Sequence, residues 1–168
     1  KCEVLKQMAL DVNPDIQIKL LKEGVTDDNL DEFLTDVDVY IDGLDVFCVN
    51  ERLKVFERCR QLGIPAISAG PLGTSVAYAV FMPNSMPFND YFDVAGRPPI
   101  EQFLWFIAGL APKALHRSYI SAIDVINIES KNVPSLPNAC QLCAGVAATQ
   151  TMKLLLGRGK IKPAPYTY

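Results

Sequence analysis

The sequence lacks the features that mark membrane proteins and nucleic-acid-binding proteins. Its longest uninterrupted apolar run covers residues 103–110, whereas a membrane-spanning helix needs roughly 20 apolar residues. Lysine and arginine are not clustered, and the formal net charge is −3, so the basic surface that binds nucleic acid is missing. These absences predict a soluble, cytoplasmic protein that binds neither membranes nor nucleic acid.

Metal-binding patterns are also scarce. The cysteines number five and cannot all pair within one chain. Three of them lie among apolar residues, as reduced thiols of a cytosolic protein do: Cys2, Cys48 and Cys59. Cys140 and Cys143 form a single CxxC, whereas a structural zinc site needs two such pairs, or one pair with two histidines. We therefore expect no zinc, and the lone His116 has no acidic neighbour that would give it a role.

The 168 residues are enough for a substantial core, and we predict a single domain over residues 1–168. The hydrophobic and charged fractions, 49% and 21%, are those of a globular protein. The chain opens on Lys1 without an initiating methionine and already inside a helical pattern. We expect its natural N-terminus to lie upstream.

Strand and helix patterns alternate along the chain and predict an α/β fold. Apolar residues at helical spacing predict helices over residues 1–12, 26–34, 49–62, 100–115 (broken at Ala111-Pro112) and 140–156. Short apolar or alternating runs predict strands over residues 16–20, 37–41, 66–68, 75–81 and 121–128, with loops over 82–99 and 131–138. Strand–helix–strand units at this spacing predict a mostly parallel sheet with right-handed crossovers. The strand over 75–81 has no helix before it, so we expect it to pair antiparallel.

Two acidic residues, Asp42 and Asp45, directly follow the predicted strand over residues 37–41. Ligands of open α/β sheets bind outside the carboxyl ends of the strands. Both carboxylates would therefore stand where a metal ion or a charged ligand can be held. The alternative is that they only cap the helix predicted over residues 49–62.

Several short motifs stand in an order and at a spacing typical of one enzyme superfamily. They are Lys1-Cys2-Glu3-Val4, Asn13-Pro14, Asp42-Gly43-Leu44-Asp45, Gly63-Ile64-Pro65, Ala69-Gly70, Ala144-Gly145-Val146 and Met152-Lys153-Leu154-Leu155-Leu156-Gly157. With these motifs the chain resembles, over essentially its whole length, the ThiF/MoeB/ubiquitin-activating-enzyme superfamily of ATP-dependent adenylyltransferases. The resemblance implies a Rossmann-like, mixed but mostly parallel sheet flanked by helices, with a C-terminal crossover loop and helices.

The resemblance also implies an ATP and Mg²⁺ site. Lys1 occupies the position of a lysine that reaches the nucleotide phosphates, and Asp45 that of an aspartate that acts on Mg²⁺ and the phosphates. These two residues would be catalytic, with Asp45 as the magnesium ligand, while Asp42 and Arg52 would complete the cofactor-binding set. A metal and a cation suit this chemistry because attack of a carboxylate on phosphorus builds up negative charge.

The chain departs from the superfamily pattern at two places. Of an Asp-Ala-Arg element only Arg52 is retained, after Asn50 and Glu51. The Gly-rich phosphate loop, the acidic residue that holds the ribose and an Arg-containing segment all lie N-terminal to Lys1 in the superfamily. The motif Gly70-Pro71-Leu72-Gly73 does not replace that loop, because it lacks a strand-to-helix context. We therefore expect this fragment by itself to be inactive.

The CxxC has a second interpretation. Superfamily members that form thioesters carry a cysteine near the position of residues 131–140, and a helix N-terminus gives a cysteine thiolate character. Cys140 and Cys143 are therefore candidate thiol nucleophiles. The alternative is that both pack as small apolar residues at the start of a helix.

The predicted function is ATP-dependent adenylation of a carboxylate, which the resemblance gives as the C-terminus of a ubiquitin-like or sulfur-carrier protein. Gly70 and the loop after it would form part of the channel for the carrier tail. The resemblance also implies a homodimer. The alternative is a non-catalytic ThiF-like scaffold or dimerisation module, while an NAD-dependent enzyme is disfavoured because no catalytic His or Tyr-x-x-x-Lys pattern is present.

Overall fold

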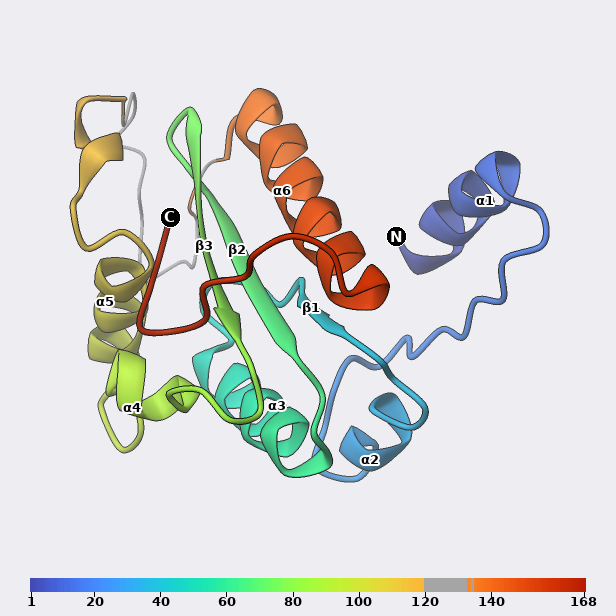
Figure 1. Ribbon diagram of the computed structural model, residues 1–168, viewed down its shortest axis with the longest axis horizontal. Coiled ribbons are helices and arrows are strands. Elements are labelled where there is room, and N and C mark those ends of the chain that lie inside the picture. The colour runs from blue at the N-terminus through green and yellow to red at the C-terminus, as the bar shows by residue number, and fades with distance from the viewer. Residues whose placement is uncertain (120–132, 134) are drawn as a thin grey trace. The chain divides into compact units, whose positions relative to one another are not determined.

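The computed structural model describes residues 1–119, 133 and 135–168 (Figure 1). These residues divide into two compact units, Lys1–Thr35 and Asp36–Tyr168, which we describe separately. The strand predicted over 121–128 lies outside the described residues, as do residues 131, 132 and 134 of the loop predicted over 131–138. The last two residues of that predicted loop belong to helix α6 (Pro137–Leu156). The single-domain organisation stays a prediction.

The first unit contains two helices, α1 (Cys2–Val12) and α2 (Leu30–Phe33). Helix α1 confirms the predicted helix and ends at Asn13, because the residue before a proline is disfavoured in helical geometry. Helix α2 is shorter than predicted because Asn29 organises the turn before it. Its carboxamide accepts a hydrogen bond from the Thr26 N–H (2.8 Å) and donates one to the Gly24 carbonyl (2.8 Å).

The predicted strand over residues 16–20 is wrong. The segment is irregular and joins no sheet among the described residues, and a strand needs a partner for its backbone hydrogen bonds. Exposed ion pairs lie in this segment and just after it, between Lys19 and Glu32 (2.8 Å) and between Lys22 and Glu3 (2.5 Å). The period-two alternation of residues 16–20 therefore belongs to a loop and not to a strand.

The second unit is an α/β structure with a small mixed sheet. The described strands follow the order β1 (Tyr40–Asp42), β2 (Ala66–Leu72) and β3 (Ser75–Phe81). Strands β1 and β2 are parallel, with Asp42 opposite Ser68, and β2 and β3 are antiparallel. The α/β class and the antiparallel pairing of β3 are confirmed. The expectation of a mostly parallel sheet is not met among the described residues, because their one parallel pair is matched by one antiparallel pair.

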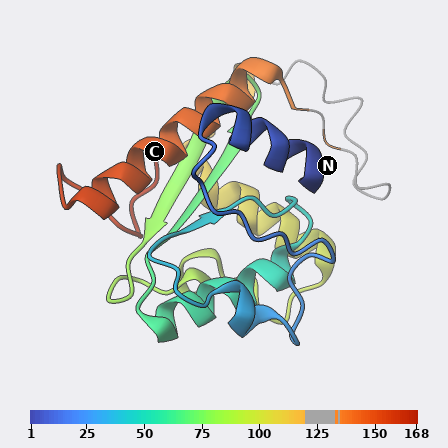
Figure 2. The same cartoon turned by 90° about the vertical axis from the view of Figure 1, so that its right-hand side faces the viewer.

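Helices cover both faces of this sheet. Figures 1 and 2 show α6 (Pro137–Leu156) along one face and α3 (Val49–Leu62) with α5 (Pro99–Leu110) on the other. Three consecutive residues of β2, from Ala66 to Ser68, are buried, as expected for a strand with both faces covered. Phenylalanine rings fill the space beneath the sheet at centroid distances between 4.5 and 6.1 Å: Phe56, Phe81, Phe88, Phe92 and Phe106.

Helix α3 matches its predicted bounds. Its buried residues recur on one stripe, and Gly63 ends it in the left-handed region at φ 76°, where glycine is favoured. Helix α5 ends before Pro112, and a separate 3-10 helix follows at Leu115–Tyr119. The loop predicted over 82–99 contains α4 (Phe88–Phe92).

The C-terminal segment lies beside β3. The N–H of Tyr78 donates to the carbonyl of Tyr168 (2.9 Å), the reverse bond is 3.1 Å, and the N–H of Ala164 donates to the carbonyl of Val80 (2.8 Å). The rings of Tyr78 and Tyr168 stack at 5.0 Å. No described helix is long and apolar enough to cross a membrane.

Candidate active site

The candidate site is the turn between β1 and α3. Strand β1 ends at Asp42, and residues 43–48 lead to the first turn of α3. Because β1 and β2 are parallel, their carboxyl ends meet at this edge, which is where ligands of open α/β sheets bind. The sequence-based placement of Asp42 and Asp45 at this edge therefore agrees with the structure.

Asp42 forms a buried ion pair with Arg52. The Arg52 Nε lies 2.6 Å from Asp42 Oδ2, and each side chain is only 2% exposed. The same oxygen accepts a hydrogen bond from the Ser68 hydroxyl (2.9 Å), while Oδ1 accepts one from the Leu44 N–H (3.1 Å). The Asp42 carboxylate is thus surrounded by neutral donors and one cation. A buried charge requires such partners, because burial removes its hydration.

Arg52 uses its remaining donors on the turn itself. Its Nη2 donates to the carbonyl of Leu44 (2.6 Å) and to that of Asp45 (3.2 Å). Its guanidinium carbon lies 4.4 Å from the ring centroid of Phe106 on α5, a cation–π distance. Arg52 therefore fastens the turn to α3 and α5. Its predicted contact with the nucleotide stays a prediction.

Asp45 is exposed, unlike Asp42. Its Oδ1 accepts a hydrogen bond from the Phe47 N–H (3.0 Å), and its carbonyl accepts one from the Cys48 N–H (2.9 Å). These two hydrogen bonds hold Asp45 in a tight turn. They leave Oδ2 of its carboxylate without a hydrogen-bond partner among the described residues. No group of three or more His, Cys, Asp or Glu that could hold a metal ion occurs in the part of the chain that the structure describes.

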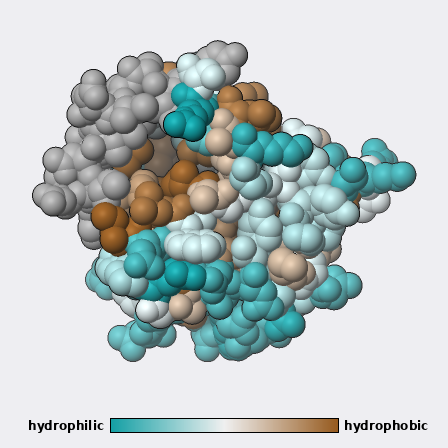
Figure 3. Space-filling model, turned by 90° about the vertical axis from the view of Figure 1, so that its left-hand side faces the viewer, coloured by the Kyte–Doolittle hydropathy of each residue, from teal (hydrophilic) through white to brown (hydrophobic). Residues whose placement is uncertain are grey.

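A cavity of about 240 Å³ adjoins this turn. Its lining combines Asp42, Asp45 and Arg52 with the second half of β2 and with one face of α5. Apolar side chains make up most of the α5 wall: Phe106, Ile107 and Leu110. On the face of the molecule that carries α5, Figure 3 shows apolar side chains gathered around a hollow.

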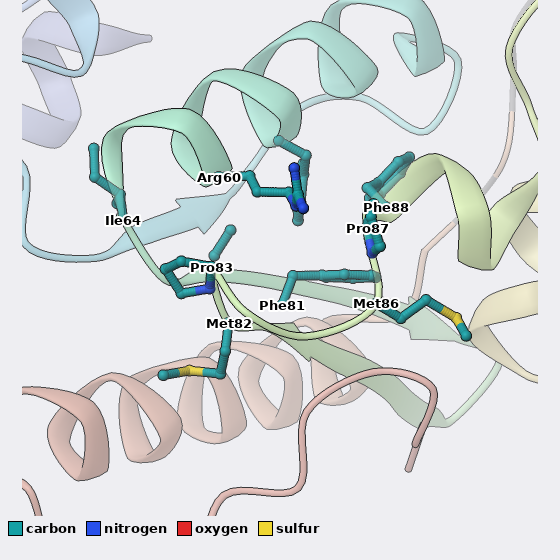
Figure 4. A pocket seen from close by; sticks show the side chains of 10 residues that line it. Arg60, Ile64, Phe81, Met82, Pro83, Met86, Pro87 and Phe88 are labelled. Carbon is teal, nitrogen blue, oxygen red and sulfur yellow. The ribbon is translucent and has the colours of Figure 1, made fainter.

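A second pocket lies beneath the other end of the sheet. Figure 4 shows Arg60 and Phe88 facing each other across it. It holds about 10 Å³, which is about the space for a single water molecule. The larger cavity beside Asp45 is therefore the better candidate for a ligand-binding site.

Lys1 belongs to the first unit, where it is the exposed N-cap residue of α1. Its carbonyl accepts a hydrogen bond from the Leu5 N–H (3.0 Å). Its predicted contact with the phosphates stays a prediction.

The two cysteines of the CxxC lie in the first turns of α6. Cys140 is exposed and Cys143 is partly buried. Burial raises the pKa of the Cys143 thiol, and the negative charges of Cys140 and Asp42 raise it further. A raised pKa favours the neutral thiol, which is the weaker nucleophile, so this helix start does not activate Cys143. A nucleophilic role for either cysteine stays a prediction.

Sequence reasoning missed Ser68, Tyr40 and Phe106. The Tyr40 hydroxyl lies 3.5 Å from Asp42 Oδ1, and burial, together with the charge of Asp42, raises the pKa of Tyr40. One signal was available for this cluster, because Arg52 stands on the same helical stripe as the apolar Val49 and Val55. A charged residue on a buried stripe implies a buried partner of opposite charge.

The fold and the site define an α/β protein with an acidic turn and a cavity at the carboxyl ends of two parallel strands. A model of the ThiF family matches residues 1–168, and the chain belongs to that family. Members of this family are typically ATP-dependent adenylyltransferases.

Two solved structures are similar to this chain. One is the crystal structure of Escherichia coli MccB with ATP, with a TM-score of 0.57 and 15% identity over 91% of this chain and 39% of that chain. The other is PaaA, with a TM-score of 0.56 and 17% identity over 95% and 46%. At these identities the likeness shows the fold alone, and the chain spans less than half of either protein. No curated protein matches the chain.

Proposed function

We propose that this chain takes part in the ATP-dependent adenylation of a carboxylate. The observation that carries the proposal is membership of the ThiF family over residues 1–168. The exposed carboxylate of Asp45, carried by a turn beside a cavity of about 240 Å³, supports Asp45 as part of the proposed site.

In this reaction a carboxylate oxygen of the substrate attacks the α-phosphorus of ATP. A bond forms between that oxygen and phosphorus, the bond from the α-phosphorus to the bridging oxygen breaks, and pyrophosphate leaves with its electron pair. Bound magnesium offsets the charge that accumulates on the phosphates. In our proposal the substrate carboxylate is that of a ubiquitin-like or sulfur-carrier protein. We also propose that the enzyme works as a homodimer.

Asp45 suits a magnesium ligand because its Oδ2 is not engaged by the described residues and its Oδ1 is oriented by Phe47. Magnesium binds through one or two carboxylates together with substrate phosphates and water, so a lone protein carboxylate fits that pattern. Lys1 would supply a cation for the phosphates. The Asp42–Arg52 pair holds the turn that carries Asp45.

The test combines binding and turnover. Because the fragment by itself is expected to be inactive, the test uses the full-length natural protein, and we expect Mg·ATP at 100 times Kd to raise its free energy of unfolding by about 2.7 kcal/mol. We also expect ATP–pyrophosphate exchange when a carboxylate acceptor is present. Asp45→Asn should lower the exchange rate on the order of 100-fold, while Asp38→Asn, a matched change at an exposed residue of the same unit, should leave it unchanged.

A full-length protein that neither binds Mg·ATP nor exchanges pyrophosphate would refute adenylation by this protein and favour the non-catalytic scaffold. Equal exchange by wild type and Asp45→Asn would refute the role of Asp45 alone. Light scattering tests the homodimer independently of both.

A further inference from the structure

We propose a second activity for this protein, thiol–disulfide exchange at Cys140 and Cys143, whose substrate is a disulfide of low molecular weight. The two cysteines reduce the external disulfide and become joined to each other. This activity goes beyond adenylation and does not depend on it, because it rests on the placement of the two thiols in α6.

Helix α6 holds the two thiols one turn apart. Cys140 and Cys143 both lie within Pro137–Leu156, and the N–H of Cys140 donates to the carbonyl of Leu136 (3.0 Å). In an α-helix the Cα atoms of residues i and i+3 are about 5 Å apart, and their side chains lie on the same face. Disulfides join Cα atoms that are about 4.4–6.8 Å apart. The helix therefore already meets the distance requirement for a bond between these two cysteines.

The two thiols differ in exposure, and this difference divides their roles. Both are free, Cys140 is exposed and Cys143 is partly buried. Burial raises the pKa of the Cys143 thiol, which makes it the weaker nucleophile toward a disulfide in solution. Cys140 is therefore the thiol that meets the external disulfide, and Cys143 is the thiol that attacks afterwards from within the protein.

The exchange takes place in two steps. The Cys140 thiolate attacks one sulfur of the external disulfide, whose S–S bond breaks, and the released thiolate takes up a proton. The sulfur of Cys143 then loses its proton to solvent and attacks the sulfur of Cys140, and the second external thiol leaves. Because Cys143 is held next to the mixed disulfide, its attack is intramolecular and has the advantage of a high effective concentration. The protein has then lost two hydrogen atoms and the substrate has gained them, and an excess of external thiol reverses the exchange.

The other three cysteines lack this arrangement, since none of them has a second cysteine three or four residues away. Cys59 is buried, and burial raises the pKa of its thiol to about 12. Cys2 is exposed and is the first residue of α1, but Leu5 stands where a second thiol would have to be. Cys2 is therefore a matched control within the same chain, an exposed cysteine at a helix start that has no partner on its helix.

The experiment exposes the reduced full-length natural protein to oxidised glutathione. N-ethylmaleimide stops the exchange, and tryptic mapping with mass spectrometry then gives the state of each cysteine. Cys140 and Cys143 fall in one peptide, because no lysine or arginine separates them. We expect this peptide to lose two hydrogen atoms and to carry no glutathione, with two molecules of reduced glutathione released for each disulfide that closes. Cys2 should instead carry glutathione.

Three serine variants assign the roles of the thiols. Cys143→Ser should keep glutathione on Cys140 and release one molecule of reduced glutathione at this peptide instead of two. Cys140→Ser should lose the closed disulfide and react more slowly at this peptide than Cys143→Ser does. The matched variant Cys2→Ser should close the disulfide between Cys140 and Cys143 at the wild-type rate.

The outcomes are distinct from those of the adenylation test, because no nucleotide takes part. A wild-type Cys140 that retains glutathione as Cys2 does would overturn the proposal, since Cys143 would then not resolve the mixed disulfide. A peptide that stays fully reduced would overturn it as well, and so would a disulfide from either thiol to a different cysteine. Equal rates for Cys140→Ser and Cys143→Ser would overturn the division of roles between the two thiols.

Discussion

Arg52→Met should be the most destabilising single change at the candidate site. The substitution removes the guanidinium but keeps a chain of similar length that can pack against Phe106. The Asp42 carboxylate, 2% exposed, would retain only neutral donors such as the Ser68 hydroxyl and the Leu44 N–H. Removing one partner of a buried ion pair costs about 3–5 kcal/mol, because the other charge stays buried without compensation.

Urea unfolding measures this cost. Trp105 is the only tryptophan of the chain and lies on α5, so its fluorescence reports on the unit that holds the ion pair. The matched control is Arg60→Met on the same helix, where the arginine is exposed, and its cost should be within about 0.5 kcal/mol.

The double variant Asp42→Asn/Arg52→Met tests the physical cause. It removes the buried charge together with its partner, and it should be more stable than Arg52→Met alone. A cost below about 1 kcal/mol for Arg52→Met would refute the reasoning. A double variant less stable than Arg52→Met would show that the penalty does not come from the unpaired carboxylate.

Two further predictions concern the core and a helix end. Burial raises the pKa of the Cys59 thiol to about 12, so the unfolded state should lose its thiol proton first as the pH rises above about 8.5. The free energy of unfolding should then fall between that pH and about 12. When it is measured by urea unfolding, Cys59→Ala should show a smaller fall than the wild type. An unchanged pH dependence in this variant would contradict the assignment to Cys59. Gly63→Ala should lower the free energy of unfolding by about 1–2 kcal/mol, since φ at this position is 76°. An exposed glycine with an ordinary φ, Gly43, gives the control.

Local patterns were sufficient for most elements of the second unit. The stripe from Val49 to Cys59 and the glycine at 63 bounded α3, and the run from 75 to 81 bounded β3. Residues 16–20 show where such reasoning fails, because alternation is also compatible with a loop whose lysines pair with Glu3 and Glu32. Whether a strand forms depends on a partner strand, and a local pattern does not contain that information.

The site was predictable only in part, for a similar reason. The strand pattern was sufficient to place Asp42 and Asp45 at the carboxyl end of β1, although the strand covers Tyr40–Asp42 and so includes Asp42 itself. The difference between them did not follow from that pattern, because it depends on Arg52, ten residues along the chain, and on Ser68, 26 residues along. One acid is enclosed by a cation and a hydroxyl, whereas the other faces outward, and tertiary packing alone separates these two environments.

The pairing of the C-terminal segment with β3 has a consequence for association. An uncovered edge strand presents unpaired backbone groups that can recruit a strand from another molecule. The hydrogen bonds to Tyr78 and Val80 from Tyr168 and Ala164 occupy this part of the edge with the chain's own residues. The C-terminal residues of the chain itself therefore block the addition of a foreign strand at this part of the β3 edge.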